Sequence, residues 1–205
     1  MALLGRMVYF PVFLAAGVGL IAPQTASAHL VTSGIGPFYD GVFHFFVSPE
    51  DLTVVIALAL FGGLSGRVAA KWLVLTLPVA WLLGTGLGLR WPGPTGSGWM
   101  PALSMLLAGL LAAVNPNVPT CLPAAVAVGL GMMHGFLNGR TMASTATSFL
   151  AAVGIVVALG LVALLLGALT SSLRVPWQKI AARTLGSWMA AIGLLALAWS
   201  LRPGS

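Results

Sequence analysis

The chain has 205 residues, of which 59% are hydrophobic and 6% are charged, and its formal net charge is +6. Soluble domains carry about 25% charged residues, so this composition excludes an ordinary soluble enzyme and predicts an all-α bundle of transmembrane helices. The positive residues stand singly at the ends of apolar runs, a pattern that favours membrane orientation and excludes a nucleic-acid partner.

Residues 1–28 are predicted to form a cleavable signal peptide. Arg6 supplies the positive start, residues 8–22 form a short apolar core, and Ala26-Ser27-Ala28 matches a cleavage site. Cleavage would leave a transmembrane helical domain of residues 29–205 that begins with His29, whose amino group and imidazole can chelate a metal. The alternative is an uncleaved anchor helix.

Residues 36–47 are too few to cross a bilayer, and we expect a short external half-helix there. Ser48, Pro49, Glu50 and Asp51 then match the first residues of a helix, with serine at the N-cap, proline at N1 and acids near the positive end of the helix dipole. Capping is therefore an alternative to metal binding for the two acids.

Six apolar segments are predicted to cross the membrane, at residues 50–64, 72–89, 99–114, 118–137, 146–169 and 181–201. The connections are short and contain Pro and Gly. With the mature N-terminus outside, Arg90, Arg140 and Arg202 also lie outside, whereas a larger basic set lies inside, as the positive-inside rule requires. That inner set is Arg67, Lys71, Arg174, Lys179 and Arg183.

The three acidic residues of the chain lie within twelve positions of one another, with a histidine between them. Because a carboxylate near the bilayer centre costs about 2.5–3.5 kcal/mol, such a cluster is a candidate cation site. The predicted topology also brings His134 and Asn138 to this external face, with Asn138 placed to hydrogen-bond the ring of His134. The expected metal ligands are His29, Asp40, His44, Glu50, Asp51 and His134.

Structural roles are the alternative for several of these residues. Asp40 and His44 suit a polar interfacial loop. His134 lies among Gly131, Gly135 and Gly139, and this spacing of small residues, like that of Gly84 and Gly88, predicts close helix packing. Cys121, which has no second cysteine to pair with, lies at the other end of its span and is expected to be a small buried residue or an exit-side ligand.

The segment His44-Phe-Phe-Val-Ser48-Pro-Glu50-Asp51 and the apolar run after it resemble a motif of the HupE/UreJ family: His, three residues, Gly, any residue, then Asp-His. In this chain Glu50 replaces the Asp and Asp51 replaces the second His. The size, the six spans, the signal ending before a histidine and Gly-x-x-His134-Gly-Phe are also similar. The resemblance implies a nickel or cobalt permease that supports metalloenzyme maturation, and the added carboxylate brings cobalt, manganese and zinc into consideration.

We therefore predict a multi-pass protein of the bacterial inner membrane, not an enzyme, whose mature N-terminus is periplasmic and which transports a divalent cation. Nickel or cobalt is expected first, with zinc, manganese and copper as further candidates, and no cofactor is expected to stay bound. The expected partners are the lipid bilayer, the metal ion, and a second copy of the chain or a metallochaperone. The alternatives are a zinc-dependent intramembrane hydrolase, a haem protein using His44 and His134, and a membrane assembly subunit that transports nothing.

Overall fold

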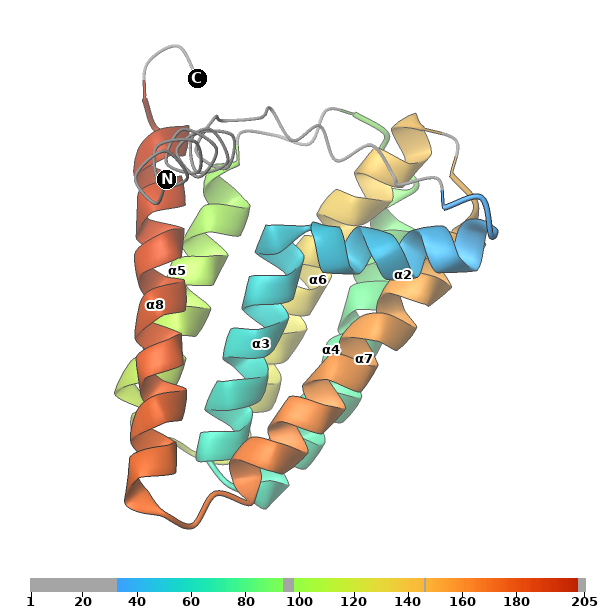
Figure 1. Cartoon of the computed structure of the whole chain (residues 1–205). Coiled ribbons are helices and arrows are strands. Elements are labelled where there is room, and N and C mark those ends of the chain that lie inside the picture. The colour runs from blue at the N-terminus through green and yellow to red at the C-terminus, as the bar shows by residue number, and fades with distance from the viewer. Residues whose placement is uncertain (1–32, 94–97, 146, 203–205) are drawn as a thin grey trace, which may run out of the picture.

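The computed structural model describes residues 33–93, 98–145 and 147–202, and within them the chain forms seven α-helices and no strand (Figure 1). The predicted all-α fold is confirmed. The predicted signal peptide and His29 lie outside the described residues. The helices are α2 (Pro37–Val47), α3 (Pro49–Leu64), α4 (Arg67–Gly88), α5 (Trp99–Val114), α6 (Leu122–Ser144), α7 (Phe149–Ser171) and α8 (Pro176–Ser200).

Each of the six predicted segments corresponds to one of the helices from α3 to α8. Four of them, α4, α6, α7 and α8, are long and apolar enough to cross a membrane alone, and α2 with α3 qualifies as a fifth, bent span. The helix α5 has 16 residues and belongs with the shorter apolar helices. The chain is thus a multi-pass membrane protein, and length and composition alone support four or five spans instead of six.

The helix α2 crosses one end of the bundle and is the short half-helix that the sequence predicts (Figure 1). It meets α3 at an angle of 74° because Pro49 disfavours helical geometry at the residue before it, and Ser48 accordingly has an extended backbone. Gly41 lets the backbone of α2 approach α7, where a Cβ would overlap the carbonyl oxygen of Ala151. Gly154 of α7 meets the carbonyl oxygen of Phe38 in the same way.

The close helix packing that the glycine spacing predicts is formed between α4 and α6. A Cβ at Gly84 would overlap the carbonyl oxygen of Met132, and one at Gly135 would overlap that of Trp81. Gly88 and Gly139 approach each other similarly, with a Cβ at Gly139 only 3.0 Å from the Cα of Gly88. The two backbones can lie this close only because these positions lack side chains.

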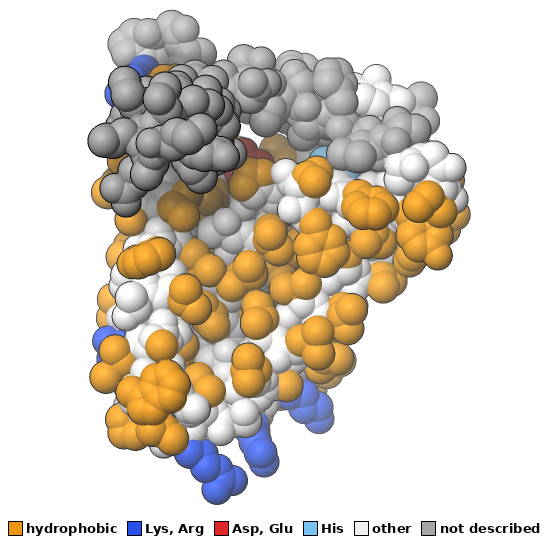
Figure 2. Space-filling model, viewed as in Figure 1, with side chains coloured by type: hydrophobic (Ala, Val, Ile, Leu, Met, Phe, Trp, Pro, Cys, Tyr) orange, Lys and Arg blue, Asp and Glu red, His pale blue; other side chains and the backbone are white. Residues whose placement is uncertain are grey.

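The two ends of the bundle differ in charge. Figure 2 shows Lys and Arg side chains at the end opposite α2, where α4 and α8 begin, and hydrophobic side chains over the outer surface between the two ends. The acids lie at the other end, in α2 and in the first turn of α3. The three acids share their end of the bundle with Arg90, Arg140 and Arg202, whereas the other five described Lys and Arg residues lie at the opposite end without an acid.

One expectation about the basic end is wrong. Cys121 is exposed instead of buried. It is the residue just before α6 begins, in the turn that follows Pro119, so its side chain lies outside the packed part of the bundle.

Replacing Gly135 with alanine should destabilise the protein, since the new methyl group meets backbone atoms of α4 that cannot rotate away. We expect the free energy of unfolding to fall by about 2 kcal/mol, because the overpacking cost exceeds the gain in helix propensity. Thermal unfolding in detergent measures the change. Gly129→Ala on the same helix is the matched control, since a Cβ there meets nothing within 4 Å. Equal melting temperatures for the two variants would contradict the close approach of α4 and α6.

Candidate functional site

The imidazole of His134, on α6, lies at the centre of a buried polar cluster at the end of the bundle that α2 crosses. Its Nδ1 is 2.7 Å from Oδ1 of Asp51 on α3, and its Nε2 is 2.8 Å from Oγ of Ser104 on α5. His134 is 1% exposed, Ser104 2% and Asp51 5%. Both nitrogens of the ring are therefore engaged away from bulk water, by side chains from two other helices.

The bend between α2 and α3 places Asp51 in this cluster. Asp51 lies in the first turn of α3, where the helix dipole favours a negative charge. The amide of Asn138 donates a hydrogen bond to its second oxygen, Oδ2, at 2.9 Å. The prediction that Asn138 hydrogen-bonds the ring of His134 is thus wrong. Asn138 bonds instead to the carboxylate of Asp51, which in turn holds the ring.

Ser104 determines which protons the ring carries. Its hydroxyl lies 2.7 Å from the carbonyl oxygen of Pro101, to which it can only donate. A hydroxyl has one proton, so Oγ then accepts a hydrogen bond from the ring, and Nε2 of His134 is protonated. At 2.7 Å, the contact between Nδ1 and Oδ1 of Asp51 is a second hydrogen bond, with one proton shared between the two atoms.

Trp81 of α4 forms one wall of the site. Its indole stacks on the imidazole of His134 with ring centroids 5.3 Å apart and planes 26° from parallel. The close approach of Trp81 to Gly135, one residue after the histidine, brings the two rings together. The imidazole is thus held by a ring face as well as by hydrogen bonds at both nitrogens.

His44 supplies a second buried imidazole at this end. Its Nε2 lies 3.4 Å from Oγ of Ser48, and its Nδ1 is buried with no hydrogen-bond partner among the described residues. The predicted N-cap position of Ser48 and N1 position of Pro49 are confirmed, but the serine makes no side-chain cap bond and faces His44 instead. Asp51 and Asn138 lie close enough to act on the His44 ring, although Asn138 gives its hydrogen bond to Asp51.

The other predicted ligands lie further out. Glu50 is exposed at the start of α3, within electrostatic range of Asp51 and His134. Asp40 faces the preceding turn, where it accepts hydrogen bonds from the backbone N–H of Ser33 at 2.6 Å and from its hydroxyl at 2.5 Å. Among residues 33–93, 98–145 and 147–202, no three His, Cys, Asp or Glu side chains form a ready metal-binding group. Metal ligation by the predicted set, His29 included, stays a prediction.

Sequence reasoning missed Ser104 and Trp81. Ser104 is the one hydroxyl residue in the apolar segment of residues 99–114, and this isolation was the available signal. The sequence gives no signal for a role of Trp81, because an aromatic residue within a membrane span is ordinarily part of the core.

Ser104, His134 and Asp51 are connected in the same order as a Ser-His-Asp catalytic triad. Two observations distinguish them from one. A nucleophilic serine donates its proton to the histidine, whereas the proton of Ser104 is directed to the carbonyl of Pro101. The serine is also buried, with 2% of its surface exposed, so it is not open to a substrate in this structure. The contact therefore serves to orient the ring.

A sequence model of a protein family, described as HupE / UreJ protein, matches residues 16–196. The matched range contains every residue of the buried cluster and each described helix apart from the last turn of α8. No curated protein and no solved structure matches the chain.

Substitutions at Ser104 should change the proton distribution of the His134 ring. In Ser104→Ala the Nε2 proton would be buried without an acceptor, so we expect the ring to lose it and the free energy of unfolding to fall by roughly 1–3 kcal/mol. Nitrogen NMR of protein labelled at its histidine rings measures the protonation, with His134→Gln identifying the signal. Ser104→Thr, which retains a hydroxyl, should resemble the wild type. An unprotonated Nε2 in the wild type would contradict the assignment and indicate a serine that donates to the ring, as in a hydrolase.

Proposed function

The chain belongs to the HupE/UreJ family, and from this premise we propose that it carries a divalent transition-metal cation across the membrane. The family is associated with nickel or cobalt transport or with the maturation of urease and hydrogenase. We propose nickel or cobalt as the cation, and the supply of a metalloenzyme in the same bacterial cell as its purpose.

The observation that carries this proposal is the buried pair of Asp51 and His134, with the imidazole of His44 buried at the same end of the bundle. Carboxylate oxygen together with imidazole nitrogen is a donor set that suits nickel, cobalt and zinc. Nδ1 of His44 is a buried ring nitrogen with no hydrogen-bond partner among the described residues, where a polar atom without a partner is costly, and a ligand could engage it. Two or three protein ligands leave positions for water, and such incomplete coordination suits an ion that must also leave.

Asp51 and His134 can exchange their shared proton for the metal. We propose that the cation takes the place of that proton between Oδ1 of Asp51 and Nδ1 of His134. Nε2 stays protonated and continues to donate its hydrogen bond to Oγ of Ser104. A metal-bound histidine commonly donates its other N–H to a fixed acceptor in this way, which holds the ring at the angle that the metal requires. Asn138 would hold the second carboxylate oxygen, as it does in this structure.

The direction of transport follows from the charge difference between the two ends. Five of the eight described Lys and Arg residues lie at the end opposite the cluster, and the end with more basic residues is normally cytoplasmic. We therefore propose that the cluster opens toward the periplasm, where Glu50, Asp40 and the predicted mature N-terminal His29 would attract the ion. A doubly charged cation that enters a negative interior gains about 4.6 kcal/mol per 100 mV, so the membrane potential can drive uptake.

Uptake of radiolabelled nickel or cobalt by cells that produce the protein tests this proposal. Asp51→Asn keeps the shape of the side chain but removes its charge, so we expect uptake to fall about tenfold or more, as for the loss of a group that supports a metal. Asp40→Asn is the matched control. It makes the same change at a carboxylate held by Ser33 and should reduce uptake by no more than about threefold.

Membrane levels of both variants, measured by immunoblot, separate loss of transport from loss of protein. Competition by unlabelled nickel, cobalt, zinc and manganese ranks the metals. Wild-type uptake by Asp51→Asn at a normal membrane level would remove the basis of the transport proposal.

A further inference from the structure

We propose that the basic end of α4 binds one anionic phospholipid, whose two acyl chains lie on either side of this helix. Two grooves run along α4. One, of about 330 Å³, lies between α4 and α7, and the other, of about 220 Å³, lies between α4 and α6. Leu75 lines both grooves, so they flank a single ridge on α4. This inference is independent of the proposed transport function.

The groove between α4 and α7 is cationic at one end and apolar along the rest. Arg67 and Lys71, one turn apart and both exposed, stand at its basic end together with Ser171 of α7. Val74 and Leu164 line the part that runs into the membrane. The three side-chain carboxylates of the chain all lie at the other end of the bundle, so none of them is placed to neutralise these two cations, and an anion from outside the chain can do so.

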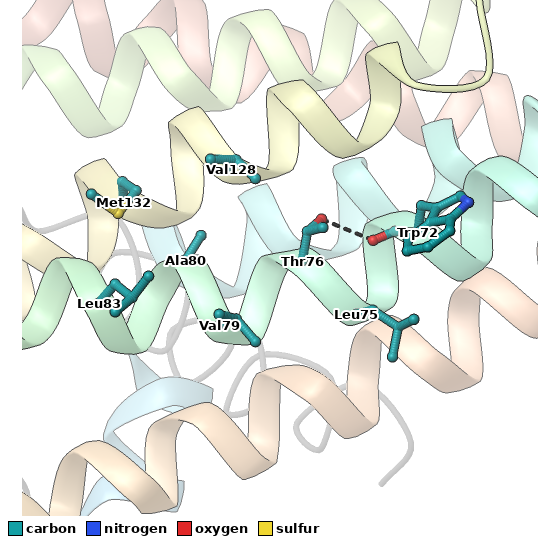
Figure 3. Close-up of a pocket in the computed structure, with 8 residues that line it drawn as sticks. All are labelled: Trp72, Leu75, Thr76, Val79, Ala80, Leu83, Val128 and Met132. Carbon is teal, nitrogen blue, oxygen red and sulfur yellow. Dashed lines mark hydrogen bonds between the residues drawn. The ribbon is translucent and has the colours of Figure 1, made fainter.

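The groove between α4 and α6 requires an apolar occupant. Figure 3 shows its lining, which extends along α4 from Trp72 to Leu83 and is completed by Val128 and Met132 of α6. Thr76 is the one hydroxyl residue of this lining, and its proton is already donated to the carbonyl oxygen of Trp72 at 2.8 Å. The lining is thus apolar apart from the Thr76 hydroxyl and the indole N–H of Trp72 at its headgroup end.

The length of this groove matches one leaflet. From Trp72 to Leu83 the helix rises roughly 16 Å, at about 1.5 Å per residue, and one leaflet supplies half of the ≈ 30 Å hydrocarbon core. A chain that descends from a headgroup at Arg67 and Lys71 would fill it. Trp72 lies at the headgroup end of the groove, and Nζ of Lys71 is 5.7 Å from its ring centre. This location suits a tryptophan at a membrane interface.

A phospholipid satisfies both grooves and both cations, whereas other occupants leave part of the surface unmatched. Free phosphate would neutralise Arg67 and Lys71 but leave the apolar grooves empty. A second copy of the chain, related by a two-fold axis through α4, would bring a second pair of cations against the first. Anionic headgroups are attracted by such juxtamembrane Lys and Arg, and basic pockets between membrane helices bind them.

Fluorescence quenching at Trp72 tests the proposal in proteoliposomes of the full chain. The probes are phosphatidylglycerol and phosphatidylcholine with brominated acyl chains, each added at increasing mole fraction to unbrominated phosphatidylcholine. The difference between wild type and Trp72→Phe isolates the signal of Trp72. We expect half-maximal quenching at a mole fraction of phosphatidylglycerol about tenfold lower than that of phosphatidylcholine, because two cations favour the anionic lipid.

Arg67→Gln with Lys71→Gln should remove this preference, and Arg174→Gln with Lys179→Gln is the matched control. The control removes two charges from the same end of the bundle but from outside both grooves, and it should keep the preference. Equal loss in the two double variants would overturn the proposal in favour of a general surface charge. If the first double variant does not fold, the comparison of the two lipids in the wild type still decides.

Three other results would overturn the proposal. Equal quenching by both lipids would mean that bulk lipid occupies the grooves without selection for an anionic headgroup. Release of phosphatidylglycerol by inorganic phosphate would mean a headgroup site that recognises the phosphate alone. Absence of Trp72 quenching, together with crosslinking between chains that carry Leu83→Cys, would mean that a second copy covers the grooves.

Discussion

The contact between Nδ1 of His134 and Oδ1 of Asp51 is the constraint around which the acidic end of the bundle is built. It joins α3 to α6 across 83 positions of the sequence and buries a carboxylate and an imidazole together. Removing one partner of a buried pair typically costs 3–5 kcal/mol, but replacing the whole pair with apolar residues is often neutral. Stability alone therefore does not explain the presence of these two residues in a membrane protein, and the proposed role in cation transport would explain it.

Several local features serve that contact. Pro49 ends α2 and turns the chain, so that the first turn of α3 presents Asp51 to α6. The glycines shared by α4 and α6 bring Trp81 against the ring of His134. Ser104 and Asn138 then satisfy the remaining polar atoms of the pair, which an apolar interior requires. Nδ1 of His44, which has no hydrogen-bond partner among the described residues, lies at the same end, and we propose that an added ion would find a ligand there.

Much of this arrangement could be predicted from the sequence. Apolar runs located the helices from α3 to α8, and glycine spacing marked faces of α4 and α6 for close packing without naming their partners. The alternation of helix direction across the membrane brought residues 40–51 and His134 to one end. The rotation of each helix and the choice of its neighbours could not be predicted, since apolar residues surround these helices on every side. The partner of Asn138, the exposure of Cys121 and the role of Ser104 all depend on that missing information.

The most direct measurement is X-ray absorption spectroscopy of purified protein loaded with cobalt or nickel. We expect a spectrum with imidazole scattering and oxygen ligands that changes in Asp51→Asn and loses imidazole contributions in both His44→Ala and His134→Ala. A metal surrounded by oxygen alone, or a spectrum that is the same in all these variants, would contradict the assignment of the Asp51–His134 pair as the cation site.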